Sequence, residues 1–273
     1  NGQLLVVDNA SPYNDPNYLV QQILLSTGVS VSNVTFNGSS TIPTGANADM
    51  IGYFSGSSNI GIPTGVLLNT GNINDAPGPN DSGSDGIDNG TSGDPDLDQL
   101  AAGAMMGTYN AAILEFDFET VTDAISFRYV FASEEYNEYV CSSFNDVFGF
   151  FISGPGIAGP FTNNAINIAQ VPSSSTYVGI NTVNNGTIGF AGMPGGCGGP
   201  GDPGLLNTMY FVDNEALGAQ SVQYDGFTTV LTAQTTLIPC ETYHIKIAVS
   251  DANDGIYDSG VFLEEASFGA VGI

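Results

Sequence analysis

The feature that most constrains the fold is the stretch 125–156, which reads ISFRYVFASEEYNEYVCSSFNDVFGFFISGPG. Its last part, 147–152, is apolar at nearly every position, as is typical of a strand buried on both faces. Between the two strands lies an acidic turn, so the fold must accommodate clustered carboxylates at the ends of buried strands. The first part places large apolar side chains on alternate positions, and hence on one face of a strand: Ile125, Phe127, Tyr129 and Phe131.

The rest of the chain shows the same β pattern in short pieces. Runs rich in Val, Ile, Phe and Tyr are separated by Gly, Asn, Asp and Pro, as in an antiparallel β-sandwich. We therefore predict an all-β fold, a large antiparallel and jelly-roll-like sandwich that forms a single domain over 1–273. The expected strands are 4–7, 29–36, 50–54, 66–68, 113–118, 125–132, 147–153, 165–170, 178–183, 209–212, 227–233, 242–250 and 261–268.

Signals for helices are few. Asp15 and Pro16 supply an N-cap and a first-turn proline, and apolar residues at helical spacing follow until Gly28, which suits a C′ position. A second short helical turn is expected within 97–106. Two long segments separate the β runs: an Asp/Gly-rich loop at 72–98 and a Gly-rich loop at 186–206.

The charge balance excludes several classes of partner. The chain carries 28 acidic residues against Arg128 and Lys246, a formal charge of −26. Non-specific nucleic-acid binding needs many basic side chains, and an anionic membrane surface would repel this protein. No apolar run approaches the roughly 18 residues of a membrane-spanning helix. Either the acidic surface serves solubility at high salt, or divalent cations occupy some of the carboxylates.

The clustering of the carboxylates favours the second explanation, bound divalent cations. Two acidic turns follow predicted strands, and their carboxylates converge if the strand ends lie on the same side of the sandwich. Calcium prefers about six to eight oxygen ligands, which such turns supply. The alternative is two separate solvated turns that use Asp, Asn and Gly for turn chemistry. The predicted calcium ligands are Glu134, Glu135, Glu138, Asn145, Asp146, Asp251, Asp254 and Asp258, with Asp94, Asp96 and Asp98 of the 72–98 loop as further candidates.

Catalytic signatures are weak. His244 is the only histidine, and it alternates with apolar residues on its strand, so we interpret it as outward-facing or bound in a polar network. Motifs for a nucleophile elbow, a P-loop, a dinucleotide site or a zinc site are missing from the sequence. Paired glutamates at 134–135 and 264–265 keep a glycoside hydrolase open as an alternative, although the chain has no Trp to stack on sugars. Arg128 is expected to pair with carboxylates.

Cysteine usage points outside the cell. The chain has three cysteines and almost no lysine. We favour a disulfide between Cys141 and Cys197, which both lie in turn-like Gly, Ser and Asn contexts. Cys240 is then the unpaired thiol. The N-terminus reads as a mature form without an export signal.

Several ordered motifs resemble the choice-of-anchor L domain, a module of secreted bacterial surface proteins. They include GVLLNTGNINDAPGPN, FASEEYNEYV, FNDVFGFFISGPG and CETYHIKIAVSDANDGIYDSGVFLEEASF, and the likeness covers nearly the whole chain. The resemblance implies export, commonly through type IX secretion, and display on or release from the cell surface. It implies no established catalytic residues.

These observations lead to the expected function. We predict a non-enzymatic extracellular surface protein stabilised by calcium, either an adhesion module or a self-assembling filament subunit. A calcium-dependent, lectin-like carbohydrate-binding module is the alternative, and a glycoside hydrolase using a glutamate pair is a further one. The chain ends at Ile273 without a visible anchor, which suits self-association. The apolar residues Leu4, Leu5, Val6 and Val7 either add to a neighbour's sheet edge or pair within their own sandwich.

Overall fold

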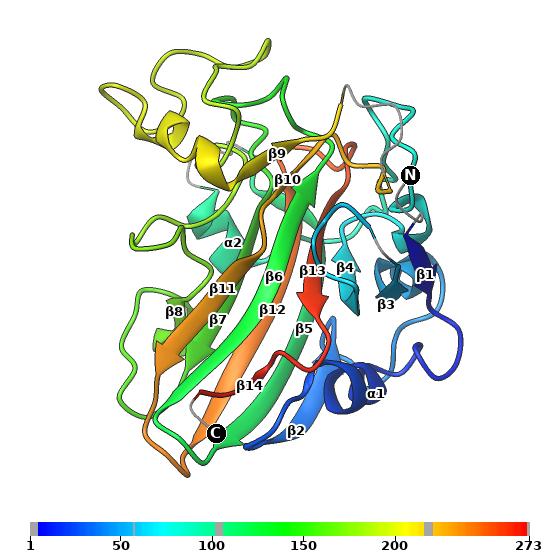
Figure 1. Ribbon diagram of the computed structural model, residues 1–273, viewed down its shortest axis with the longest axis vertical. Coiled ribbons are helices and arrows are strands. Elements are labelled where there is room, and N and C mark those ends of the chain that lie inside the picture. The colour runs from blue at the N-terminus through cyan, green and yellow to red at the C-terminus, as the bar shows by residue number, and fades with distance from the viewer. Residues whose placement is uncertain (1–4, 57, 102–105, 216–220, 272–273) are drawn as a thin grey trace.

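The computed structural model describes residues 5–56, 58–101, 106–215 and 221–271. The described residues form two antiparallel β-sheets that face each other, as the sequence predicts (Figure 1). In the first sheet the strands run in the order β1 (Val6–Asp8), β3 (Ile51–Ser55), β4 (Thr64–Asn69), β13 (Ser259–Glu264), β6 (Ala124–Ser133), β10 (Gly226–Thr228) and β9 (Phe211–Asp213), with β11 (Leu231–Thr236) and β14 (Gly269–Ala270) also paired to β6. In the second sheet the order is β2 (Val29–Phe36), β5 (Thr108–Thr120), β12 (Thr242–Ala252), β7 (Val147–Ser153) and β8 (Ile166–Asn167).

Helical structure is short. The first helix, α1 (Pro16–Tyr18), begins after Asp15, whose side chain accepts a hydrogen bond from the Asn17 N–H. It continues as the π-helix Leu19–Leu24, and the second helix is α2 (Pro95–Leu100). Single 3₁₀ turns cover Ala46–Met50, Ile73–Asp75, Thr162–Asn164, Pro203–Leu206 and Thr208–Tyr210.

The main core lies between the two sheets. Alternate residues of β6 point inward and stack on aromatic rings of β7, with Phe127 and Tyr129 each 4.8 Å from the Phe150 ring and Phe131 4.9 Å from the Phe148 ring. The predicted apolar face of β6 is therefore confirmed. Every residue of β7 is buried, because this strand is covered on its outer face as well.

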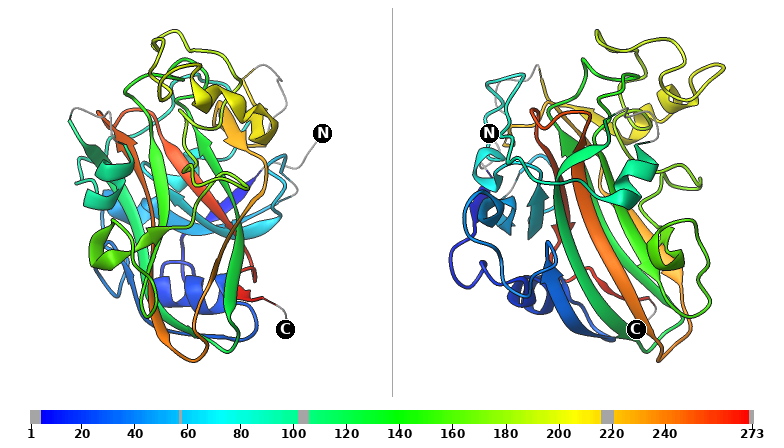
Figure 2. Two further views of the ribbon diagram at one scale, coloured as in Figure 1. Left: turned by 90° about the vertical axis from the view of Figure 1, so that its left-hand side faces the viewer. Right: turned by 180° about the vertical axis from the view of Figure 1, so that it is seen from behind.

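Part of the outer face of the second sheet, over β7 and β12, is covered by α2. Leu97 of α2 packs in a small apolar cluster that includes Val147, Phe151 and Ala248. Figure 2 shows this arrangement from behind, with α2 beside β7 and β12. The helix thus fixes the C-terminal end of the 72–98 loop against the sheet.

Several predicted elements differ from the structure. The 178–183 segment forms turns rather than a strand, although Val178, Ile180 and Val183 are buried, because the segment covers the end of the core. The strand expected at 227–233 is divided into β10 and β11. The first helix ends at Leu24, and Gly28 instead takes a positive φ of 78° in the turn before β2.

The N-terminal strand pairs within its own sandwich. Val6 and Val7 lie opposite Ser55 and Phe54 of β3, and Leu5 donates its N–H to the Ser221 carbonyl. This agrees with the second of the two alternatives for these residues. Leu4 lies outside the described residues.

Candidate metal centre

The topology brings acidic residues of both sheets to one end of the sandwich, the upper end in Figure 1. In the first sheet, Ser133 at the end of β6 lies opposite Ser259 of β13 and Gly226 of β10. Glu134 and Glu135 follow β6, Asp258 precedes β13 and Asp225 precedes β10. In the second sheet, Ser250 near the end of β12 lies opposite Val147 at the start of β7, which brings Asp251 and Asp146 to the same end. The two predicted acidic turns therefore converge.

Asp146 joins the two sheets. Its Oδ1 accepts a hydrogen bond of 2.9 Å from the Ala252 N–H of β12, and its Oδ2 accepts one of 2.7 Å from the Ser259 hydroxyl of β13. Asp251 accepts a bond of 3.0 Å from the Asn110 amide through Oδ2, and its carboxyl group also interacts with the Thr70 hydroxyl. Its Oδ1 and the Oε2 of Glu135 are buried without a hydrogen-bond partner among the described residues.

A second part of the acidic end surrounds a very small cavity. Asp258 and Glu134 line it together with Asp75 and Asp85 of the 72–98 loop, and its volume is about 10 Å³. Such a volume accepts one water molecule or a single ion. Two buried polar atoms of its lining, the Oε1 of Glu134 and the hydroxyl of Tyr224, have no partner among the described residues.

The 72–98 loop crosses this end and donates backbone N–H groups to its carboxylates. The Ile87 N–H bonds Oδ1 of Asp258 at 2.9 Å, and the Asp85 N–H lies 3.4 Å from Oε2 of Glu134. Close packing also requires Gly71, because a Cβ there would overlap the Asp258 carboxylate. The loop is thus held over the acidic residues.

Burial and mutual repulsion oppose ionisation here. Burial raises the pKa of Glu134 to about 10, with the Asp225 charge adding to the rise, and raises the pKa of Asp258 to about 7. Burial also raises the pKa of Glu135, and the charges of Asp146, Asp254, Asp251 and Glu138 raise it further. Each shift means that a negative charge at this place is costly unless a positive one accompanies it.

The three basic side chains of the chain are all engaged elsewhere. Arg128 forms an exposed ion pair with Glu264 at 2.8 Å, which confirms the expected pairing with a carboxylate. His244 contacts Asp117 at 2.8 Å and Glu115 at 3.3 Å. Lys246 contacts Asp94 and Asp96.

The comparison with protein families decides what kind of protein carries this centre. The sequence model of the choice-of-anchor L domain matches residues 6–269, nearly the whole chain. The protein belongs to this family. Membership implies a secreted or cell-surface protein, in a family that is not known to be enzymatic. Comparisons with curated proteins and with solved structures gave no match. Among the described helices, none has the length and apolar character to cross a bilayer.

In this choice-of-anchor L domain, some predicted ligands have other partners. Asp94 and Asp96 both form ion pairs with Lys246, and Asp98 accepts bonds of 2.7 Å from both the N–H and the hydroxyl of Thr108. Asn145 bonds Tyr177 through its amide and the Asn181 N–H through its oxygen. We therefore leave these four residues out of the ion site proposed below.

Glu138 belongs to a different group. It is exposed, and one ligand atom from each of Glu138, Glu215 and Asp225 lies within 4.8 Å of the others. Asp225 is buried, accepts a bond of 2.7 Å from Asn80 and leaves Oδ2 unpartnered among the described residues. Glu138 thus lies at the rim of the centre, while Asp254 is half-buried and its charge acts on Glu135 and Asp146.

Sequence reasoning missed Asp75, Asp85, Asp225 and Glu215. Asp75 and Asp85 lie in the acidic 72–98 loop. The composition of this loop does not distinguish them from Asp94 and Asp96. Asp225 precedes a short strand much as Asp146 does, and that position at a strand start was the available signal.

The disulfide favoured from the sequence is present. Cys141, directly after the acidic turn, is bonded to Cys197 of the Gly-rich loop, and Cys240 is free and exposed. The bond fixes the 186–206 loop against the turn that carries Glu138. The loop and the centre are therefore mechanically connected.

His244 gives a prediction that is separate from the acidic end. The hydrogen bond to Glu115 raises the pKa of His244, burial opposes the rise, and Asp117 raises it further. We expect the single imidazole to titrate above about pH 6.5 in an NMR experiment. Because the folded pKa is raised, this contribution to stability is complete below about pH 6.5 and is lost as the pH rises through the folded pKa. Glu115→Gln should lower the midpoint and Glu119→Gln, at an exposed site, should not. A wild-type midpoint at or below the ordinary value would contradict the prediction.

Proposed function

We propose that the acidic end binds calcium and that this choice-of-anchor L domain is a non-enzymatic, calcium-stabilised structural module of the cell surface. The observation that carries the proposal is the set of buried carboxylate oxygens, at Glu134, Glu135 and Asp251, that have no hydrogen-bond partner within the described part of the chain, while the basic side chains are engaged elsewhere. Calcium prefers carboxylate and backbone oxygens, and its charge would offset the repulsion.

The ion would tie together parts of the chain that are far apart in sequence. Glu135 comes from the first sheet and Asp146 and Asp251 from the second, while Asp85 comes from the loop. A cation held by Glu135, Asp146 and Asp251 would join the two sheets, and a second one held at the small cavity by Glu134, Asp258 and Asp85 would hold the loop in place. Such cross-linking suits a rigid unit for adhesion or for assembly outside the cell, where calcium is abundant.

The shape of the centre supports a structural role rather than glycoside hydrolysis. Small-molecule sites usually measure about 300–1,000 Å³, whereas the cavity at Glu134 measures about 10 Å³. Of the other glutamate pair, Glu264 is bound to Arg128. The cavity at Glu134 is too small for a sugar ring.

One amide substitution tests the proposed site. Asp251→Asn removes a buried like charge and a ligand together, so in excess chelator the variant should melt at a higher temperature than the wild type. In calcium it should gain less, and calorimetric titration should show weaker or lost calcium binding. Asp81→Asn, at an exposed position of the loop, should behave as wild type in both conditions. Unaltered calcium affinity in Asp251→Asn would refute the site.

A cavity near the disulfide supports the alternative of a lectin-like, carbohydrate-binding module. A cavity of about 370 Å³ lies beside the disulfide, and hydroxyl and amide side chains contribute to its lining, among them Ser142, Ser143, Tyr177 and Asn181. Its size falls in the range of small-ligand sites. Binding on a glycan array that is lost in Tyr177→Ala would favour this function.

A further inference from the structure

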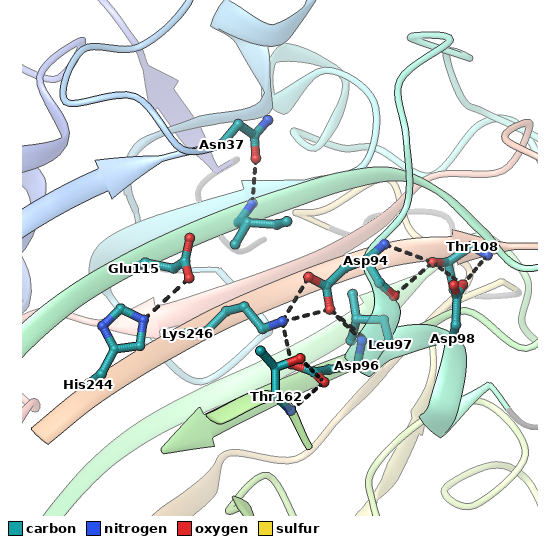
Figure 3. Close-up of polar contacts among 11 residues, drawn as sticks. Asn37, Asp94, Asp96, Leu97, Asp98, Thr108, Glu115, Thr162, His244 and Lys246 are labelled. Atoms are coloured by element: carbon teal, nitrogen blue, oxygen red, sulfur yellow. Dashed lines mark hydrogen bonds and ion pairs between the residues drawn. The ribbon is translucent and has the colours of Figure 1, made fainter. Parts of the chain in front are cut away.

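The only lysine of the chain is buried against two buried aspartates. A simple ion pair needs neither the burial nor the second carboxylate. Lys246 of β12 is 9% exposed, and the two aspartates that contact it, Asp94 and Asp96, are 6% and 3% exposed. Figure 3 shows the lysine directed at both carboxylates beneath α2. The Nζ atom also lies 5.0 Å from the centre of the Phe151 ring. Charged groups in such an apolar place carry a desolvation cost of several kcal/mol per ion, by order of magnitude.

The carboxyl carbon of Asp94 is placed for attack by the lysine nitrogen. Its two oxygens lie 2.8 and 2.7 Å from Nζ, so the nitrogen faces the middle of the carboxyl group, where the carbon is. Oδ1 also accepts hydrogen bonds from the Asp96 and Leu97 N–H groups at 2.9 and 3.2 Å. Backbone donors in this position stabilise the negative charge that an oxygen develops when a nucleophile adds to its carbon.

Asp96 is held as a proton acceptor. Its Oδ2 lies 2.6 Å from Nζ, while Oδ1 accepts bonds of 2.8 Å from both the N–H and the hydroxyl of Thr162. Burial raises the pKa of Asp96, but the hydrogen bonds from Lys246 and Thr162 outweigh it and hold the pKa below its usual value. Before any reaction the group is therefore an ion pair, so the lysine must first lose a proton to become a nucleophile.

We propose that Lys246 and Asp94 form an intramolecular amide bond, with Asp96 as the group that moves the protons. Lys246 passes one proton through Asp96 to Oδ2 of Asp94, and the neutral amine then attacks Cγ. The bond from Nζ to Cγ forms, Asp96 takes a second proton from nitrogen, and the bond from Cγ to Oδ2 breaks as that oxygen leaves with the two protons as water. Asp96 ends as it began, and no oxidant, cofactor or other reactant is needed.

The physical advantage of the bond is twofold. Fixed contact between amine and carboxyl replaces a bimolecular condensation by an intramolecular one, which favours amide formation between groups that are largely buried. The product is neutral, so the desolvation cost of the lysine and of one aspartate disappears. The amide would also join the end of the 72–98 loop covalently to β12, independently of calcium.

The sequence supplies a direct test, because trypsin can cleave only after Arg128 and Lys246. The protease requires a free cationic side chain at the cleaved position. We expect the denatured and reduced protein to be lighter than its sequence mass by one water molecule. We also expect trypsin to leave Lys246 uncut and to yield 1–128 still joined to 129–273. The disulfide cannot imitate this result, since both of its cysteines lie within 129–246.

Variants test whether the mass loss depends on the residues assigned to the amide bond. Asp94→Asn with Asp96→Ala, and Lys246→Arg, should show the full sequence mass; the arginine variant should be cut after position 246. Asp98→Asn, on the same helix but exposed and without contact to Lys246, should keep the mass loss. Separate fragments 1–128, 129–246 and 247–273 from the wild type at full mass would overturn the proposal. A link mapped by tandem mass spectrometry to Asp96 would overturn the assigned roles.

Discussion

Removal of calcium is expected to lower the melting temperature of the domain by about 5–10 °C for each ion lost. A ligand bound only to the folded state at 100 times its Kd contributes about 2.7 kcal/mol, and 1 kcal/mol shifts the melting temperature of a domain near this size by about 2–4 °C. Scanning calorimetry with and without chelator measures the shift. Chelator that is saturated with calcium beforehand serves as the control and should have no effect. An identical melting curve in both conditions, together with no calcium by elemental analysis, would exclude the proposed role of the ion.

In chelator, the stability of the same protein should increase as the pH falls towards 5. The pKa of Asp258 is raised to about 7 and that of Glu134 to about 10, above their ordinary values near 4. Because the folded pKa exceeds the unfolded one, the unionised form stabilises the fold at low pH, and this stabilisation is lost as the pH rises through about 7 for Asp258. Calcium-free protein should therefore gain stability between about pH 7 and pH 5. Calcium-loaded protein should lose stability over that range, since protons compete for its ligands.

Loss of the buried lysine should be far more costly than loss of the exposed arginine. Lys246→Met leaves Asp94 and Asp96 as buried charges without compensation, which typically costs about 3–5 kcal/mol. Arg128→Ala breaks an ion pair whose arginine side chain is 48% exposed, and should cost no more than about 1 kcal/mol. Chemical denaturation of the two variants in the same calcium concentration measures the difference.

A triple variant distinguishes charge from packing as the cause. Adding Asp94→Asn and Asp96→Asn to Lys246→Met removes the stranded charges, and asparagine still caps the start of α2. Most of the lost stability should return. If the triple variant is as unstable as Lys246→Met, the lysine acts through its apolar stem or through the proposed amide, and the electrostatic account is wrong.

Local periodicity explains why much of the β-structure could be predicted. The alternation through Ile125 and Phe131 places one face of β6 inward because successive side chains of a strand point to opposite sides. The same alternation puts Arg128 on the opposite face of the strand, where it forms the expected pair with a carboxylate, Glu264. It failed for 178–183, where buried apolar residues lie in turns, since burial alone does not require a strand. It also missed the π-helical hydrogen bond from the Leu25 N–H to the Val20 carbonyl, which has no signal in residue spacing.

The sequence by itself determined the all-β class, the family likeness and the excess of carboxylates over basic groups, because these depend on local pattern and composition. Only the tertiary structure decided which carboxylates share a site. Asp94 and Asp85 belong to one loop, yet the first contacts Lys246 and the second lies beside Glu134. That division follows from strand pairing and from the docking of α2 on the second sheet. Asp94 and Lys246 are 152 positions apart and Asp85 and Glu134 are 49 positions apart, and no local pattern encodes contacts at such separations.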